Sequence, residues 1–420
     1  MIKNENFDVV VAGGGPAGLA AAVALARLGF ATALVTKESA AGGRPDNRTA
    51  ALFTGSITFL RNLGVWDGVA AVSAPISAIR ILDDTGALLK APEVVFTAAE
   101  IGLDAFGYNV PNSPLVDALL AVARRLPLAV IEAGVAEVAI AEDGVTLALE
   151  SGARLRGRLV VGADGRRSLC RQAAGIATDS WSYDQAALTT SFTHQRPHAG
   201  VSTEFHRPAG PFTTVPLPGT ASSLVWVERP EVAERLAALD DQAFRAMLED
   251  RLQGLLGPIG TVAPRARFPL SGLTARGFAR NRVALVGEAG HVVPPIGAQG
   301  LNLGLRDAAW LADSLADGRA KGRDCGDPVT LARYTAARRI DVAARIWTID
   351  ILNRSLLSSL LPVHLARGLG LHALKALAPL RQIVVREGLA PSGATPRLMQ
   401  PDAGGVDLTA LAPHPPEAAA

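Results

Sequence analysis

The possible folds are limited most by a glycine-rich turn near the start of the chain, Gly13-Gly14-Gly15-Pro16-Ala17-Gly18. The turn follows a β-branched run, Phe7–Ala12, and leads into an Ala/Leu-rich segment, Leu19–Leu28. A second apolar run, Ala31–Val35, comes next. This order predicts a βαβ unit with the turn at the N-terminus of its helix, and therefore an α/β fold of the Rossmann type.

The spacing of the glycines in this turn is that of a dinucleotide-binding site. Gly13 allows the tight turn, Gly15 leaves bare backbone for a phosphate, and Gly18 lets the helix pack on the strand. Pro16 and Ala17 begin the helix, whose free N–H groups and positive partial charge suit a pyrophosphate. A purely structural turn is the alternative, and the flanking strand and helix argue against it.

The end of the second strand departs from the usual pattern. A carboxylate normally stands there and binds the ribose hydroxyls of the dinucleotide. Counting from Gly29, this chain has Thr36 at that position. A threonine hydroxyl makes one hydrogen bond and lacks the bidentate, charge-assisted contact of a carboxylate. Glu38 is near enough to contribute, although a solvated loop is the simpler expectation for it.

The rest of the chain predicts β-rich insertions into this domain. At 420 residues the chain exceeds the ~250–300 residues at which one core usually stops growing. Ile76–Val95 alternates around a hairpin turn at Asp83-Asp84-Thr85-Gly86, and Ala186–Val227 is a second β-rich block. We expect a nucleotide-binding domain over residues 1–75, 107–182 and 277–325, a β-rich domain over 76–106 and 183–276, a helical segment over 326–390, and a flexible tail over 391–420.

Helices are also predicted outside the βαβ unit, among them Thr54–Leu63 and Ala308–Ala316. Asn112 precedes Ser113 and Pro114 and is expected to cap a helix that runs to about Arg125. Glu231–Leu256 is predicted to be helical. Val329–Leu357 is predicted to be a long amphipathic helix whose apolar face holds Leu331, Tyr334, Ile340, Ile346 and Leu352.

Composition excludes several classes of protein. The formal net charge of +2 is too balanced for a nucleic-acid partner, although it is compatible with a weak attraction to anionic lipid. The two cysteines have neither CxxC nor zinc spacing, so no metal site and a reduced compartment are expected. We find no room for a signal peptide and no spanning helix, so the expected location is cytoplasmic. Leu356–Leu380 is apolar enough to contact the inner membrane or a partner, with an ordinary core-packing helix pair as the alternative.

Two further motifs carry polar residues at predicted strand ends. The second is Gly162-Ala163-Asp164-Gly165-Arg166-Arg167-Ser168. The third is Gly287-Glu288-Ala289-Gly290-His291, continued by Pro294-Pro295-Ile296-Gly297-Ala298-Gln299-Gly300-Leu301-Asn302-Leu303-Gly304 and Asp307. A carboxylate at a strand end can accept hydrogen bonds from sugar or ribityl hydroxyls. A glycine-rich segment that enters a helix can offer N–H donors to a planar ring.

These three motifs, in this order from Phe7 to about Gly388, resemble the flavoprotein aromatic hydroxylases, class A monooxygenases of the para-hydroxybenzoate hydroxylase type. The resemblance implies a Rossmann-type FAD-binding domain of the GR2-like flavoprotein hydroxylase fold, with an inserted β-sheet substrate domain and a helical C-terminus. It also implies that the first motif binds the ADP part of FAD. The second would serve the cofactor and NAD(P)H, and the third would contact the ribityl chain and the flavin ring. Glu288 stands where the family has Asp.

The resemblance assigns roles to individual residues. Arg48, in the segment Asp46-Asn47-Arg48-Thr49-Ala50-Ala51-Leu52, would lie near the cofactor, with a surface salt bridge as the alternative. Asn112 stands where the family has an amide facing FAD. No catalytic residue is certain, although the ring would lie against Pro295, Gly297, Gln299 and Gly300. His291 and His198 are weaker candidates for proton transfer. The expected cofactor-binding residues are Gly13, Gly15, Pro16, Ala17, Gly18, Thr36, Arg48, Asn112, Asp164, Gly165, Gly287, Glu288, Pro295, Gly300, Leu301 and Asn302.

Within this superfamily the chain is most similar to the ring hydroxylases of ubiquinone biosynthesis. The residues that carry this finer resemblance include Tyr183-Asp184-Gln185, Arg267-Phe268-Pro269-Leu270 and Arg386-Glu387-Gly388. It implies hydroxylation of a polyprenylated phenol, in which NAD(P)H acts transiently to reduce FAD and O2 forms a flavin C4a-hydroperoxide. Other ubiquinone-biosynthesis proteins are implied as partners. A hydroxylase of a soluble phenol and a non-catalytic flavin-bearing member of a quinone-biosynthesis complex are the alternatives.

Overall fold

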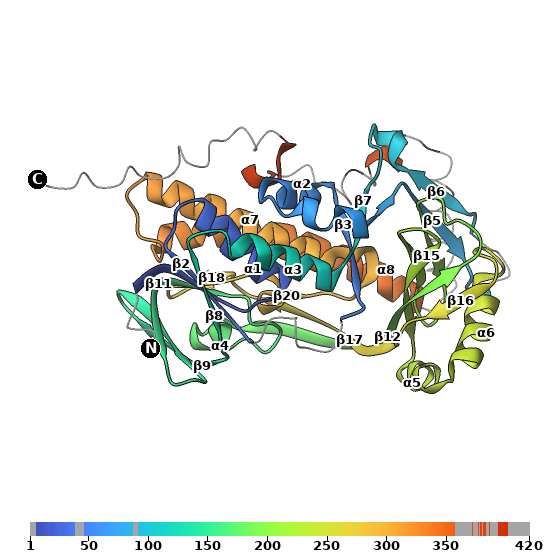
Figure 1. The fold of residues 1–420 in the computed structure, drawn as a ribbon, viewed down its shortest axis with the longest axis horizontal. Coiled ribbons are helices and arrows are strands. Elements are labelled where there is room, and N and C mark those ends of the chain that lie inside the picture. Colours follow the sequence, from blue (N-terminus) through green and yellow to red (C-terminus); the bar gives the residue numbers. More distant parts are fainter. Residues whose placement is uncertain are drawn as a thin grey trace, which may run out of the picture.

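The computed structural model describes residues 6–37, 46–86, 91–357 and 394–401, with a few single residues between 372 and 386. Among them the strands form three sheets, and the long helices α7 (Gln299–Ala320) and α8 (Pro328–Leu357) run alongside. In Figure 1 the first sheet lies at the end of the molecule that holds the N-terminus, whereas the second extends from the middle, at β20 and β17, to the opposite end. None of the helices in the described part of the chain is long and apolar enough to cross a membrane.

The first sheet has a parallel centre in the order β19-β11-β1-β2-β8, with antiparallel strands at its margins. Its strands are β1 (Asn6–Ala12), β2 (Thr32–Thr36), β8 (Leu128–Glu132), β9 (Val135–Ala141), β10 (Gly144–Leu149), β11 (Arg154–Gly162), β18 (Ala279–Arg280) and β19 (Val283–Leu285). Val9 and Val11 of β1 face one core, whereas Val10 and Ala12 face the other, because side chains alternate along a strand. Both faces are therefore covered, which explains why the central strands are almost wholly apolar.

Helices cover this sheet on both faces. The larger core lies under α1 (Pro16–Arg27), α3 (Asn112–Ala123) and α7, together with α2 (Thr54–Asn62). The short helix α4 (Leu169–Ala173) packs on the other face. The predicted βαβ unit is therefore present at the expected residues.

The second sheet has nine described strands, drawn mainly from the two segments in which β-rich insertions were predicted. Its strands are β5 (Ala78–Asp83), β6 (Val94–Thr97), β12 (Thr178–His194), β13 (Val201–His206), β14 (Phe212–Leu217), β15 (Ala221–Glu228), β16 (Ile259–Val262), β17 (Ala266–Ala275) and β20 (His291–Val292). β5 pairs in parallel with β13, which joins the first insertion to the second. An aromatic core under α5 (Pro230–Ala238) and α6 (Asp241–Leu252) closes one face of this sheet. A third sheet, β3 (Thr49–Phe53), β7 (Gly107–Pro111) and β4 (Ala74–Ile76), has three strands.

Two details of the predicted helices are wrong: one helix is interrupted, and another has a different capping residue. The helix predicted over Glu231–Leu256 is two helices, because Asp240 accepts a hydrogen bond from the Ala243 N–H and starts α6 anew. Asn112 does not cap α3: Pro111 is the capping residue, and the Asn112 side chain points instead to Asp46.

The predicted apolar face of α8 is wrong at one position, Ile340, while Ile346 packs against the core as predicted. Leu331 and Tyr334 are buried as expected, but Ile340 is 75% exposed. The buried row continues through Arg338, which is 0% exposed because it meets the buried carboxylate of Asp307. The charged residue Arg338 therefore lies on the buried face of α8, whereas the apolar residue Ile340 lies on the exposed face.

The C-terminal expectations are partly corrected. Residues 394–401 are not loose, because Leu398 and Met399 are buried and Arg397 pairs with Asp313 and Asp317 of α7. The segment Leu356–Leu380 lies almost entirely outside the described residues.

Candidate cofactor-binding site

The three motifs meet at one edge of the first sheet. Parallel pairing aligns Ala12 of β1 with Gly162 of β11 on one side and Val35 of β2 on the other. Gly162 is in turn aligned with Leu285 of β19. The loops that follow these strands are therefore neighbours at the carboxyl ends, where open α/β sheets bind their ligands.

Three of the four glycines in the first motif are required by close packing. A Cβ on Gly13 would lie 2.1 Å from the Ala163 carbonyl oxygen, and Gly13 has a φ of +123°. A Cβ on Gly18 would lie 2.2 Å from the Gly13 oxygen, and one on Gly14 would lie 1.9 Å from Thr36 Oγ1. Gly15 differs, because a Cβ there would have no protein atom within 4 Å. The packing of the fold does not explain Gly15, whereas a phosphate that approaches the N-terminus of α1 does.

Thr36 lies where the sequence predicted, at the end of β2 beside the glycine turn. Its hydroxyl donates to the Lys37 carbonyl oxygen at 3.0 Å and packs against Gly14. With its proton engaged, Thr36 can still accept a hydrogen bond from a ribose hydroxyl. Glu38 lies outside the described residues.

Asp164 of the second motif lies immediately beside the glycine turn of the first motif, at Gly13. One carboxylate oxygen accepts the Cys170 N–H at 3.1 Å, while the other, Oδ1, is buried and has no partner among the described residues. Gly165 follows in the left-handed region with φ +77°. Arg171 then ties the second motif to the third by donating to the Ala289 carbonyl oxygen at 2.8 Å.

The third motif packs directly on the first turn of α1. Cβ atoms on Gly287 and Gly304 would lie 3.2 and 3.0 Å from the Ala17 side chain. Gly287 also has a positive φ of 63°. Glu288 is exposed, so its longer side chain meets no steric obstacle in this structure.

Arg48 connects the cofactor site to the second sheet. It makes two hydrogen bonds of 2.7 Å to Asp46, and its guanidinium lies 5.2 Å from the ring centre of Phe268 in β17. The pKa of Arg48 is raised, first by the hydrogen bond to Asp46 and also by the negative charges of Asp46 and Glu288. Arg48 therefore lies close enough to Glu288 of the third motif to interact with its charge, and it makes a salt bridge with Asp46. Its contact with FAD stays a prediction.

Asn112 reinforces this cluster. Its amide donates to Asp46 at 3.2 Å, and its buried Oδ1 has no partner among the described residues. Hydrogen bonds from Arg48 and Asn112 lower the pKa of Asp46, although burial alone would raise it. Sequence reasoning missed Asp46, whose position two residues before Arg48 was the available signal.

The predicted ring-binding segment is a turn that runs into α7. Pro295, Gly297 and Gly300 are exposed, and Ala298 takes a left-handed φ of 52° where α7 begins. The N–H groups in the first turn of a helix have no partner within that helix, so this turn offers donors outward. Gln299 is mostly buried, and its side chain accepts a hydrogen bond from Arg345.

The Asn302 side chain is fully used within the protein. Its oxygen accepts from the Phe53 N–H at 3.0 Å and from Ser56 at 2.7 Å. Its amide donates to the carbonyl oxygens of Ala51 and Ala298 at 2.8 and 2.7 Å. Asn302 therefore fixes the start of α7 against β3 and α2, and only its backbone can face a ligand.

A buried ionic network holds the third motif in place. Asp307 accepts hydrogen bonds from the Gly287 N–H at 2.9 Å, from His291 at 2.7 Å and from Arg338 at 2.6 Å. Arg338 also donates to Asp341 at 2.6 Å. Burial raises the pKa of Asp307, but His291 and Arg338 more than offset this and leave it below the ordinary value. His291 is thus held by a carboxylate, which is a positioning role.

His198, the other histidine candidate, and the nearby His194 both have structural partners. His198 contacts the Leu217 carbonyl oxygen at 2.8 Å with one ring nitrogen and accepts the Gly200 N–H with the other. His194 contacts the Arg196 carbonyl oxygen and Ser222. Burial lowers the pKa of His194. Neither ring has a free nitrogen for a substrate proton.

The described residues suit FAD. The open space above Gly15 can take a phosphate, and the unpartnered oxygens of Asp164 and Asn112 can accept hydrogen bonds from cofactor hydroxyl or N–H groups. A family model described as "FAD binding domain" matches residues 6–348. The chain belongs to this FAD-binding family. The family match confirms FAD as the cofactor and confirms the predicted fold class.

Individual relatives cover nearly the whole chain. The ubiquinone hydroxylase UbiL of Rhodospirillum rubrum is 38% identical over 403 residues, which are 94% of this chain and 92% of that protein. The 3-demethoxyubiquinol 3-hydroxylase of Escherichia coli is 30% identical and covers 92% of this chain and 100% of that protein. The p-nitrophenol 4-monooxygenase PnpA of Pseudomonas putida has the same fold, with a TM-score of 0.74 at 23% identity over 93% of this chain and 100% of that chain.

Proposed function

We propose that the chain is an FAD-dependent monooxygenase that hydroxylates the aromatic ring of a polyprenylated phenol in ubiquinone biosynthesis, using NAD(P)H and O2. The observation that carries this proposal is the convergence of all three motifs at one sheet edge, with Arg48 reaching from that edge to Phe268 of the second sheet. The names of the ubiquinone hydroxylase and the demethoxyubiquinol hydroxylase support the substrate class.

FAD, when bound, supplies the redox chemistry with which O2 is activated for insertion into a ring. The protein binds and orients it. Gly15 and the N-terminus of α1 take the pyrophosphate, and Asp164 Oδ1 accepts from a hydroxyl of the cofactor. The first-turn N–H groups of α7 would face the flavin ring. Asn302 holds that turn through the Ala298 carbonyl oxygen, and Asp307 holds the preceding part of the third motif through the Gly287 N–H.

The second sheet is proposed to form the substrate side of the site. Phe268 is 37% exposed beside Arg48, and Thr49 of β3 contacts Ser223 of β15 at 3.0 Å. This wall excludes water and positions the phenol, which is the protein's main contribution when a cofactor performs the difficult step. We further propose a peripheral contact with the inner membrane, where a polyprenylated substrate resides, and contacts with other ubiquinone-biosynthesis proteins.

The test combines a deletion strain with purified enzyme. In the strain we expect loss of ubiquinone and accumulation of a prenylated phenol, and mass spectrometry of that compound gives the ring position. The purified FAD-loaded protein should consume NAD(P)H and O2 and form a hydroxylated ring in equal amounts. Unchanged ubiquinone with a hydroxylated soluble phenol would point instead to a different phenol hydroxylase. Flavin that never turns over with any phenol would point to a non-catalytic role in a quinone-biosynthesis complex.

A further inference from the structure

The outer face of α8 carries a row of exposed apolar side chains. Val329, Ile340, Trp347 and Ile351 are 56%, 75%, 69% and 46% exposed. Their spacings of 11, 7 and 4 residues place them on one line along a helix with 3.6 residues per turn. This row, here called the α8 stripe, extends for roughly 33 Å at 1.5 Å per residue.

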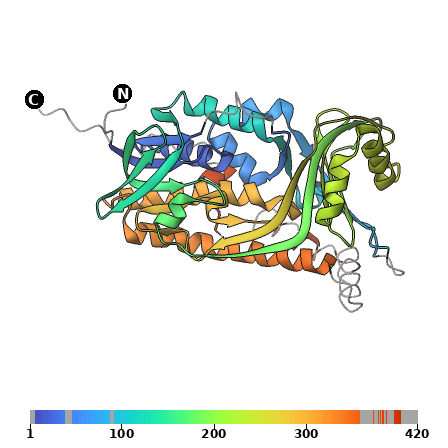
Figure 2. The same ribbon diagram turned by 90° about the horizontal axis from the view of Figure 1, so that it is seen from below.

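The opposite face of α8 is fixed along most of the length of the helix, so the stripe is held outward. Arg338 is bound to Asp307 near the middle of the helix. Towards the C-terminal end, Asp350 accepts from Tyr183 of β12 at 2.8 Å, and Asn353 donates to Gln185 at 2.9 Å. In Figure 2 α8 follows one edge of the molecule from the first sheet towards the second.

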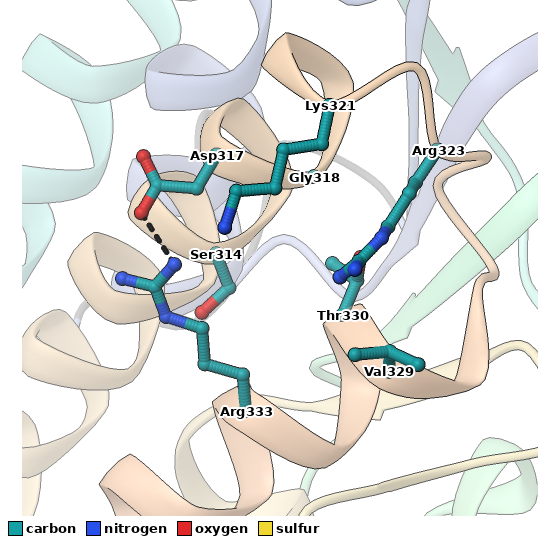
Figure 3. A pocket seen from close by; sticks show the side chains of 8 residues that line it. All are labelled: Ser314, Asp317, Gly318, Lys321, Arg323, Val329, Thr330 and Arg333. Carbon is teal, nitrogen blue, oxygen red and sulfur yellow. Dashed lines mark ion pairs between the residues drawn. The ribbon is translucent and has the colours of Figure 1, made fainter.

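A basic cavity lies at the N-terminal end of the stripe. It has a volume of about 240 Å³ and is lined by Ser314, Asp317, Gly318, Lys321, Arg323, Val329, Thr330 and Arg333. Figure 3 shows the Lys321, Arg323 and Arg333 side chains arranged around it. Val329 belongs to both the cavity and the stripe.

The carboxylates near this cavity leave it with a positive charge. Asp317 pairs with Arg333 at 2.6 Å and also with Arg397, which lies outside the lining, at 2.9 Å. Arg323 is 4.0 Å from Asp327. Asp327 also accepts the N–H and the hydroxyl of Thr330. The lining holds three cations against one carboxylate, so an anionic group is its natural ligand.

We propose that this face of α8 docks on the surface of an anionic phospholipid bilayer, with the stripe in the headgroup–acyl boundary and a lipid phosphate at the basic cavity. An apolar row with an exposed Trp beside cationic side chains is the arrangement by which a helix lies in a membrane interface. A single row of four side chains falls far short of the ~1,600 Å² that a standard protein–protein interface buries, which argues against a second copy of the chain. The inference deepens the proposed membrane contact and rests on it for its biological purpose.

The test is co-sedimentation of the full-length, FAD-loaded protein with vesicles. We expect binding to equimolar phosphatidylglycerol and phosphatidylcholine, and weaker binding to phosphatidylcholine alone. Ile340→Glu/Trp347→Glu should lower the partition coefficient at least about tenfold, because charges replace apolar contacts. Lys321→Ala/Arg323→Ala should lower it by roughly 25-fold, at about fivefold for each cation. The control is Val72→Glu: Val72 is 42% exposed in a different element, the 3-10 helix Ala70–Val72, so this variant should leave binding unchanged.

Two results would overturn the docking surface. One is vesicle binding by the α8 variants that equals that of the Val72 variant, or no binding by any form. The other is light scattering that shows a wild-type dimer which Ile340→Glu/Trp347→Glu converts to a monomer, because this would assign the stripe to a second copy. Hydroxylation of a short-chain, water-soluble substrate is measured on the same proteins. If wild type binds vesicles through the stripe but never hydroxylates, the proposed function fails and the docking surface stands.

Discussion

Replacing Arg338 by Met tests whether the buried network holds the cofactor edge together. Arg338 and Asp307 are both 0% exposed, and their side chains meet at 2.6 Å. Removing one partner of a buried ion pair leaves an uncompensated charge and costs about 3–5 kcal/mol. Because Asp307 also holds the Gly287 N–H and His291, we expect the variant to bind FAD more weakly as well.

The pH dependence of this loss gives the sharper test. Without Arg338, the pKa of Asp307 should rise relative to the wild type, because only His291 and the Gly287 N–H then offset the effect of burial. The folded variant holds the Asp307 proton to a higher pH than the folded wild type does, so the stability lost through the substitution grows as the pH rises through the raised pKa. Urea unfolding should therefore show a larger loss at about pH 8 than at about pH 4.

A matched control is Arg333→Met. Arg333 lies on the same helix and is paired with Asp317 at 2.6 Å, but its side chain is 50% exposed. An exposed pair contributes only about 0–1 kcal/mol. If Arg338→Met costs no more than this control, or if its cost does not change with pH, the assignment of Asp307 as a buried carboxylate neutralised by Arg338 is refuted.

Three further predictions concern the same edge. Gly15→Ala should weaken FAD binding without changing the melting temperature of the apoprotein, whereas Gly14→Ala should lower that temperature because its methyl would lie 1.9 Å from Thr36 Oγ1. Glu288→Ala should reduce FAD retention, and full flavin occupancy after gel filtration would contradict the role proposed for it. Burial alone would raise the pKa of Asp341, but three arginines lower it to about 2. The ionised Asp341 carboxylate should therefore contribute about 2 kcal/mol to the free energy of unfolding above pH ~4, and this contribution should be lost as the pH falls towards ~2. Acid unfolding of Asp341→Asn should lack this pH-dependent contribution.

Sequence patterns predicted those parts of the fold that depend on neighbouring residues alone, such as the periodicity of a strand or helix and the glycines of a tight turn. The βαβ unit at Phe7–Thr36 follows from strand and helix periods and from glycines that only a tight turn requires. The three motifs were recognisable because each follows a strand directly. Their meeting at one edge then follows from parallel pairing, with no long-range information needed.

The parts that were missed depend on contacts between residues distant in sequence. The buried face of α8 was misjudged at Ile340 because Arg338 takes part in that face, and nothing local shows that Asp307 will neutralise it. The packing of residues 394–401 depends on Arg397, whose partners lie about 80 residues earlier. One break was readable: Asp240 is a strong helix-capping residue inside the predicted helix over Glu231–Leu256.

Asn302 shows why a polar residue in a binding motif need not touch the ligand through its side chain. The motif alone placed it among the cofactor contacts, yet its amide makes four hydrogen bonds within the protein. Asn302→Ala leaves those buried groups without partners, at about 1–3 kcal/mol for each unsatisfied group. We therefore expect this variant to lower the melting temperature of the apoprotein, the opposite of the pattern for Gly15→Ala. An unchanged apoprotein with weakened FAD binding would show that the side chain contacts the cofactor after all.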